Sequence, residues 1–570
     1  MRVIWAACLA AALASEGTHL AAAQQAVAPS RVTPETLRPA PAPPPVIELP
    51  SGAPEAAPSG PAANLSVTVR RFEAEGTFPE FQSQTAALLD PLRGKRMTVA
   101  QIYALAGELE RAYAAAGYIL ARVVVPPQRL ADGGAVRLVV IDGVIERVDV
   151  SAVPERQRAV VAARMASIVG KPYITLDEIG RRLLLVGDLP GIQLRSTLAR
   201  GTTSGGTLLV VEATQNYVTG SVGVDDHLPT SLGTWSVNTN LALNDVLGLG
   251  EQAYFTYSSN PDLGSPRLRV RGGGIVFPIG DDGFTLNPEY SESVARPIPA
   301  VGTPASLGDF QRLALRAGYP LVRTREETLT LQATGEWDDE KLNAIDFGTL
   351  LYHDIYGVAR LSAHDALDVP WLPWGASAVL DGTLSHGLAG RDGSAAVPLS
   401  AQGASPVFSK VNLTAGLRQP LPQAFELDFV GRAQSTFGSP VMLSEQFSLD
   451  GPDALSSFAA GTFSVDQGAS LRLEFARPVS IVVLDNVEPL NLSPYLFGAY
   501  GYGQIADPTA AQKAAIDAGS AGFGLRTSTG ANAAGLPLGS SLAVEFGRQL
   551  SNVPGERLGY RANVSLNVTF

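Results

Sequence analysis

The last eleven residues of the chain, Tyr560-Arg561-Ala562-Asn563-Val564-Ser565-Leu566-Asn567-Val568-Thr569-Phe570, alternate strictly between apolar and polar side chains. Successive side chains of a β-strand point to opposite faces, so one face of this strand is wholly apolar and the other wholly polar. In a soluble sandwich the apolar face would pack on a second sheet, whereas in an outer-membrane barrel it would contact lipid around a wet interior. The segment therefore predicts one strand of an antiparallel sheet.

The same alternation recurs upstream as far as about residue 217. Charged residues occupy the polar face of several of these segments, which favours an aqueous interior over a sandwich core. The segments start near residues 218, 233, 251, 266, 282, 312, 326, 351, 376, 409, 424, 468, 494, 518, 540 and 559. That count is even, as in bacterial single-chain barrels. We predict a 16-stranded antiparallel transmembrane β-barrel over residues 215–570.

The composition excludes several classes of protein. The 570 residues carry 42 basic and 54 acidic side chains, a balance that disfavours nucleic acid as a partner. One cysteine, Cys8, and five histidines leave no set of ligands for a zinc framework, and we expect no catalytic site, metal centre or cofactor. Beyond the N-terminus there is no uncharged apolar run long enough for a membrane helix, so a helical membrane protein is excluded.

The N-terminus predicts export. Residues 1–23 follow the charged, apolar and small-residue order of a secretory signal peptide. Residues 24–64 are rich in proline and alanine and predict an extended linker that acts as a spacer. The alternative is a plug segment, part of which, Pro34–Arg38, folds as a short helix when the rest of the protein holds it.

Two consecutive units of α+β type precede the barrel, over residues 65–142 and 143–214. Each shows a strand, a helical region and two further strands, which indicates an internal repeat. Thr98 and Thr175 each begin a capping box, because a Gln or Glu follows three residues later, and both predict the start of a helix. We expect each unit to be a small sheet with helices on one face.

These units and the barrel resemble the two-partner secretion transporters, the haemolysin-activator type TpsB proteins. Residues 117–128, followed by 143–148, resemble the first POTRA domain of that family, and residues 187–192 resemble the second. Residues 244–251 resemble an early barrel turn, and the terminal aromatic resembles the signal read by the barrel-assembly machinery. The resemblance implies a substrate-recognition motif of Gly117, Tyr118, Arg122, Pro126 and Gln128, and an assembly signal of Tyr560, Leu566, Val568 and Phe570.

The resemblance also implies that the loop between the eleventh and twelfth strands folds back into the lumen. In the family its tip reads Val-Arg-Gly followed by an aromatic residue, and the Arg pairs with an Asp of the thirteenth strand. Here Ser456 stands at the Arg position and Ala499 at the Asp position, so we expect no Arg–Asp pair. The implied lumen loop motif consists of Ser456, Phe458, Asp466 and Gly468. The alternative is a surface loop with no gating role.

The resemblance implies a transporter in the outer membrane of a Gram-negative bacterium. Its POTRA domains would lie in the periplasm and capture an unfolded exoprotein by strand addition to a sheet edge, and its barrel would secrete that partner. The other expected partners are outer-membrane lipid and, during biogenesis, the barrel-assembly machinery. The alternatives are an outer-membrane β-barrel hydrolase and a passive porin. No His-Glu-x-x-His or Gly-x-Ser-x-Gly motif supports the former, and tandem folded units argue against the latter.

Overall fold

The computed structural model describes residues 28–39, 46–47, 63–203, 205–262, 264–299, 303–391, 404–482, 489–508, 512–530, 538–553 and 559–570. The expected signal peptide lies outside these residues, as does most of the expected linker. No helix in the described part of the chain is long and apolar enough to cross a membrane.

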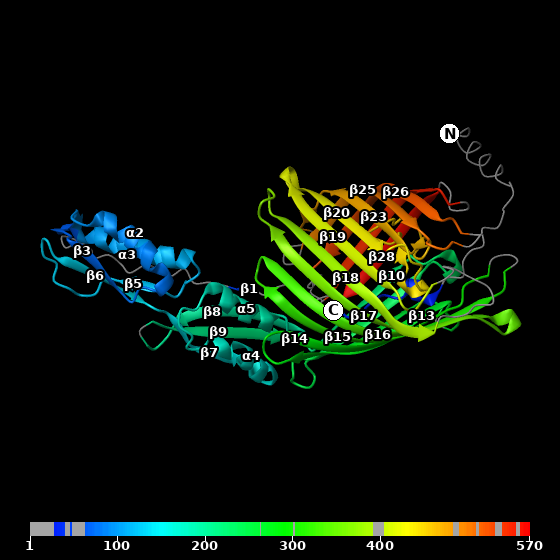
Figure 1. Cartoon of the computed structure of the whole chain (residues 1–570), viewed down its shortest axis with the longest axis horizontal. Helices are drawn as coiled ribbons and strands as arrows, with labels where there is room; N and C mark the ends of the chain where they lie inside the picture. Colours follow the sequence, from blue (N-terminus) through cyan, green and yellow to red (C-terminus); the bar gives the residue numbers. More distant parts are fainter. Residues whose placement is uncertain are drawn as a thin grey trace.

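The C-terminal part of the chain is a closed antiparallel barrel, and the fold prediction is confirmed (Figure 1). The barrel is 16-stranded although seventeen strand labels follow, because β23 and the short β24 are two parts of one strand, and both pair with the same edge of β25. The interruption falls at Arg477-Pro478, where proline has no N–H for the ladder. The strands are β10 Val218–Asp225, β11 Ser236–Asn244, β12 Gln252–Ser259, β13 Leu268–Ile279, β14 Phe284–Ala295, β15 Ser306–Arg323, β16 Glu327–Ala344, β17 Thr349–Val369, β18 Ala376–Arg391, β19 Ser409–Leu421, β20 Phe425–Ser435, β23 Gln467–Ala476, β24 Val479–Ile481, β25 Leu490–Gln504, β26 Ala515–Thr529, β27 Gly539–Ser551 and β28 Tyr560–Thr569.

The predicted strand starts agree with these bounds to within a few residues. The largest difference is β15, which begins at Ser306 rather than near residue 312. Its first residues show no clear apolar alternation, and they become strand by pairing with the end of β16, where Ser306 faces Ala344. The last strand, β28, closes the barrel by pairing with β27 and β10.

Two units with the same topology precede the barrel, as the repeat predicted. In each, two helices follow the first strand, and this strand pairs parallel with the third, which pairs antiparallel with the second. The first unit contains β2 Ser66–Thr68, β3 Arg71–Glu75, α2 Gln82–Leu89, β4 Arg96–Thr98, α3 Val99–Ala115, β5 Arg122–Val124 and β6 Ala135–Ile141. The second contains β7 Val144–Ala152, α4 Arg158–Met165, α5 Leu176–Gly187, β8 Ile192–Arg200 and β9 Gly206–Gln215.

Both predicted capping boxes are present: Thr98 caps α3 and Thr175 caps α5, each with the reciprocal bond from the third helical residue. The first strand of the main sheet in this unit is β3, which pairs with β6. The preceding strand β2 pairs only with β4 among the described residues. The sequence of β3, Arg71-Phe72-Glu73-Ala74-Glu75, did not predict a strand because three of its five residues are charged. Its Phe72 and Ala74 pack against the core.

The second unit sits against turns at one end of the barrel, among them the turn of residues 244–251 that resembles an early barrel turn of the family. Asp245 accepts a hydrogen bond of 2.6 Å from the buried side chain of Gln157 and another of 2.6 Å from the N–H of Gly250. On the other side of the contact, Arg323 of β15 forms an ion pair with Asp188 at 2.6 Å. These bonds hold the second unit at one end of the barrel, and the first unit projects away from the barrel beyond it (Figure 1).

The two units share a tight joint. Leu120, from the first unit, packs in the hydrophobic core of the second. Gly143 lies directly against it, and a Cβ at Gly143 would stand 2.1 Å from the carbonyl oxygen of Leu120. Only glycine allows this approach of two backbones.

We expect Gly143→Ala to loosen this joint, because the new methyl group displaces the Leu120 backbone from the second core. Overpacking of this kind costs about 1–3 kcal/mol. Hydrogen exchange on the full chain should show faster exchange at residues 118–124 and 143–150. The matched control is Gly107→Ala in α3, where nothing lies within 4 Å of the added Cβ. Equal exchange in both variants would contradict the prediction.

Candidate functional site: the barrel lumen

The N-terminal segment of residues 28–39 lies inside the barrel, so the spacer prediction is wrong for these residues. Ala28, Ser30 and Leu37 are buried. Ser30 donates its hydroxyl to Glu340 of β16 at 2.6 Å, and Thr33 bonds Ser293 of β14 at 2.7 Å. The segment thus fills part of the lumen and contacts the wall on several strands.

The helical turn in this segment lies at Pro29–Val32 (η1), not at the predicted Pro34–Arg38. Pro29 occupies the first helical position, where its missing N–H costs nothing. Pro34 ends the turn, because the residue before a proline is biased toward extended backbone, and Thr33 has φ −95° and ψ 125°.

The loop between β20 and β23 also folds into the lumen, as the resemblance implied. It contains a small ribbon in which β21, Phe447–Ser448, pairs with β22, Ser464–Val465. Asp450 stabilises the ribbon from within, because its carboxylate accepts hydrogen bonds from the N–H groups of Gly461 at 2.9 Å and Phe463 at 2.7 Å. The alternative of a surface loop does not fit this position.

The tip of the loop docks on a charged site of the wall. The hydroxyl of Ser456 donates a short hydrogen bond to Glu545 of β27 and accepts one of 2.6 Å from the guanidinium of Arg472 of β23. The amide of Asn563 of β28 donates to the carbonyl of Ser456 at 2.7 Å. The neighbouring Ser457 and Ser520 of β26 have hydroxyl oxygens 2.5 Å apart.

Arg472 is the centre of this wall site. Its side chain is 2% exposed and forms ion pairs of 2.6 Å with both Glu474 and Glu545. Arg526 pairs with the same Glu474 at 2.6 Å, so two cations and two anions balance one another. The ring of Phe497 lies 4.1 Å below the Arg472 guanidinium.

The guanidinium at this contact therefore comes from the wall and not from the loop. Ser456 occupies the position where the resemblance implies Arg, and Ala499, the position where it implies Asp, is the register partner of Arg472 on β25. No Arg–Asp pair joins these two positions. The charge is placed on a neighbouring strand instead, and the loop contributes a neutral hydroxyl.

The other predicted loop residues have structural contacts. Phe458 is buried beside Phe463, with ring centroids 4.7 Å apart. Asp466 is fully buried and accepts hydrogen bonds from the N–H groups of Val441 and Ala506. Gly468 lies against β25, where a Cβ would stand 2.6 Å from the carbonyl oxygen of Tyr502.

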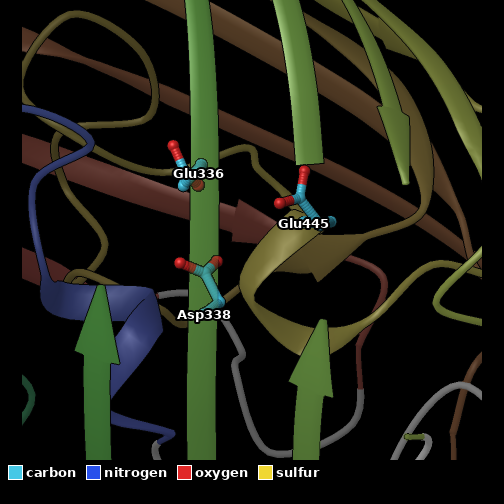
Figure 2. A group of neighbouring side chains, drawn as sticks. All are labelled: Glu336, Asp338 and Glu445. Atoms are coloured by element: carbon cyan, nitrogen blue, oxygen red, sulfur yellow. The ribbon is translucent and has the colours of Figure 1, made fainter. Parts of the chain in front are cut away.

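A second charged cluster anchors the base of the loop. Glu336 and Asp338 of β16 face Glu445 of the short helical turn η10, Leu443–Glu445 (Figure 2). Arg360 of β17 bridges Glu336 at 2.8 Å and Glu445 at 2.6 Å, and two further cations complete the cluster. These are Lys410 at 2.8 Å from Glu445 and Arg312 at 3.1 Å from Asp338. Three acids thus face three bases, and the cluster serves as an anchor of balanced charge.

The predicted recognition motif of the first unit lies mostly at the joint and in the core. Gly117 has φ +93° after the end of α3, and its carbonyl accepts the N–H of Leu176 from the second unit. Tyr118 is buried, and its hydrogen bond to Glu80 raises the pKa of the Tyr118 hydroxyl.

The remaining motif residues border β5. Arg122 forms an ion pair of 2.6 Å with Glu110. The side-chain amide of Gln128 donates to the carbonyl of Arg137 and accepts from its N–H, which are the two hydrogen bonds that a neighbouring strand would make. Pro126 lies just beyond β5 and is partly buried.

The residues of the assembly signal lie on the closing strand. Tyr560, Leu566 and Phe570 point outward and are 67%, 44% and 48% exposed. The N–H and carbonyl of Phe570 both bond Gly220 at the start of the barrel. Val568 pairs with Val222 across the same seam.

Sequence reasoning missed Arg472, Glu545 and Glu445 as parts of the site. Arg472 and Glu545 were visible only as charges on the polar face of a strand, one pattern among many. Their separation, 73 residues, carries no local signal. The available signal was that Arg472 and Glu545 each lie between two apolar residues of a predicted strand, which places both charges on the inward face of the barrel.

Two models of known protein families match this chain. Residues 67–143 match the model of the POTRA domain, ShlB-type. Residues 205–527 match the model of the haemolysin secretion/activation protein ShlB/FhaC/HecB, which is more than half of the chain.

Curated relatives are similar over part of their length. The outer membrane transporter CdiB of Dickeya dadantii is 24% identical over 66% of this chain and 66% of its own length. The haemolysin transporter protein HpmB of Proteus mirabilis is 25% identical over 43% of each chain. The heme/hemopexin transporter protein HuxB of Haemophilus influenzae is 21% identical over 79% of this chain and 81% of its own length.

Solved structures share the fold. CdiB from Escherichia coli superposes with a TM-score of 0.68, at 20% identity and over 95% of this chain and 94% of that one. CdiB from Acinetobacter baumannii gives a TM-score of 0.59 at 16% identity, over 92% of this chain and 95% of that one.

Proposed function

Because the chain belongs to the haemolysin secretion/activation family ShlB/FhaC/HecB, we propose that it is an outer-membrane transporter that secretes an unfolded partner exoprotein. The observation that carries the proposal is a closed barrel whose lumen is filled by two parts of its own chain, residues 28–39 and the loop of residues 436–466. Both are held by side-chain contacts that displacement can break without unfolding the wall. A passive porin needs no such fillers.

The tandem units supply the edges for capture. The edge strand β5 borders the sheet of the first unit, and β8 borders that of the second. Antiparallel β9 covers one side of β8, and on its other side the described residues place only Val46–Ile47 (β1), which pair parallel with Arg195 and Ser196. An extended exoprotein segment would add to such edges through backbone hydrogen bonds. Because the second unit contacts the barrel, a chain captured on β8 would be held near the barrel.

The outer surface and the last strand suit an outer-membrane protein. Large apolar side chains on the outward face of the strands remain exposed, among them Leu313, Leu361, Leu413 and Phe523. A lipid-facing band has this composition. The barrel-assembly machinery would read the outward aromatic and aliphatic residues of β28 during biogenesis.

The test compares extracellular and surface proteins of the parent strain with those of a strain from which this gene is deleted. We expect one large protein to disappear from outside and its remnants to appear in the periplasm, and the intact gene to restore it. A complementing gene with Gly143→Ala should restore it less well than one with Gly107→Ala. An unchanged set of secreted proteins, with altered uptake of small solutes, would contradict the proposal and favour a porin.

A further inference from the structure

We propose that the lumen wall formed by β14, β15 and β16 is a binding track for polypeptide main chain, which residues 28–39 occupy at rest and the passing exoprotein occupies during secretion. The inference rests on the proposed function and adds the site and the chemistry of conduction. The ligand is an extended chain of any sequence, recognised through its peptide groups.

Wall side chains hold the backbone of the N-terminal segment by both donors and acceptors. Glu340 accepts the N–H of Ser30 at 3.3 Å, and Glu289 accepts the N–H of Leu37 at 3.1 Å. In the opposite sense, Arg316 donates to the carbonyl of Glu35 at 2.8 Å. Arg312 donates to the carbonyl of Pro34 at 3.5 Å.

The four wall residues lie on adjacent rows of one stripe. On β15, Arg312 and Arg316 are separated by Ala314, whose register partner on β14 is Glu289. Glu340 pairs with Phe310, the next inward row of β15. All four residues are at most 7% exposed with the segment in place. Together they offer a row of peptide-binding groups along the direction of the strands.

Each donor of the track has an acid beside it. Arg316 lies 3.0 Å from Glu289, and Arg312 lies 3.1 Å from Asp338. A pair of this kind presents one donor and one acceptor, as the edge of a sheet does, and has little net charge. Such a wall neither rejects nor traps acidic or basic stretches of a passing chain. It therefore suits a cargo whose sequence varies along its length.

Glycines of the wall and of the neighbouring strand β13 make room for the segment. A Cβ at Gly308 of β15 would stand 2.6 Å from Pro29, and one at Gly272 of β13 would stand 2.4 Å from the carbonyl oxygen of Tyr290 and 2.5 Å from Leu37. Two glycines thus make a shallow bed for an extended chain.

The track also has unused acceptors. The second carboxylate oxygens of Asp338 and Glu340 are buried and receive no hydrogen bond from the described residues. The bound segment begins with a helical turn and contains three prolines between residues 28 and 39, so it offers few N–H groups to the wall. A fully extended chain has more N–H groups to offer, and Glu340 already contacts the segment through its other carboxylate oxygen.

The test uses purified protein in planar lipid bilayers, with residues 28–39 deleted so that the wall is exposed. The probe is an uncharged synthetic polypeptide of Gly, Ser, Thr and Asn, long enough to cross the barrel, and the readout is the dwell time of each current block. The wall variant is Glu289→Met with Arg316→Met. Replacing a buried ion pair by apolar residues of similar volume is often neutral for stability.

The control is Arg418→Met with Asp428→Leu, which removes an ion pair of 3.0 Å between β19 and β20. In the described part of the chain, neither residue forms a hydrogen bond or ion pair with residues 28–39. We expect the wall variant to shorten the dwell time about fivefold for each net hydrogen bond lost, and the control to leave it unchanged. Glu340→Met repeats the test on the neighbouring row if the double variant forms no channels.

Equal dwell times in the wall variants and the control would overturn the track. A probe that never blocks the deletion variant would overturn it as well. The current measurements need no exoprotein, so they are independent of the gene-deletion test. An unchanged set of secreted proteins after deletion would contradict the proposed function, whereas an unchanged dwell time would contradict only the binding track.

Discussion

Arg472→Ala is expected to destabilise the barrel by about 3–5 kcal/mol, the usual cost of removing one partner from a buried ion pair. The substitution leaves Glu545 and Glu474 without the guanidinium that joins them, and Arg526 reaches only Glu474. It also removes a donor to Ser456 at the loop tip. Urea unfolding of the folded barrel in detergent, followed by its heat-modifiable migration in gels, measures the effect.

Two further variants decide whether charge at the loop contact causes this loss. Arg418→Ala removes a guanidinium that is 63% exposed, and we expect little change in the free energy of unfolding. Ser456→Arg, added to Arg472→Ala, returns the cation from the loop side to Glu545 and should recover part of the stability. If the double variant is no more stable than Arg472→Ala alone, the wall and the loop are not interchangeable sources of the charge.

A disulfide between the loop tip and the wall should abolish secretion. The hydroxyl oxygens of Ser457 and Ser520 are 2.5 Å apart, so Ser457→Cys with Ser520→Cys places two thiols within bonding reach. The locked loop stays in the lumen, where an unfolded chain has to pass. Secretion of the partner protein is measured with and without a membrane-permeant reductant, which should restore it.

The matched control for the lock is Ser362→Cys with Thr383→Cys, whose hydroxyl oxygens are 3.0 Å apart on the neighbouring strands β17 and β18. This disulfide joins two wall strands and leaves the loop free, so secretion should continue under oxidising conditions. Normal secretion with the loop locked would contradict a role for loop movement. The lone Cys8 lies in the expected signal peptide, outside the described residues.

The wall of the barrel and the tandem units were predictable because local patterns encode them. A strand with one face in lipid and one in water has to alternate, and this alternation located the sixteen strands of the barrel. The two helix starts at Thr98 and Thr175 were predictable for the same reason, since a capping box satisfies N–H groups within four residues. The charged strand β3 was not predicted, because only two of its side chains, Phe72 and Ala74, pack against the core.

The contents of the lumen were decided by tertiary structure alone. Ser30 and Glu340 are 310 residues apart, and Ser456 and Glu545 are 89 apart. A guanidinium satisfies the loop contact equally from the loop or from the wall, so substitution at position 456 did not reveal that Arg472 supplies the charge. Alternation along a strand records only which face is wet. Which polar groups meet across that wet interior depends on the curvature and register of the closed barrel, and no short stretch of sequence contains either.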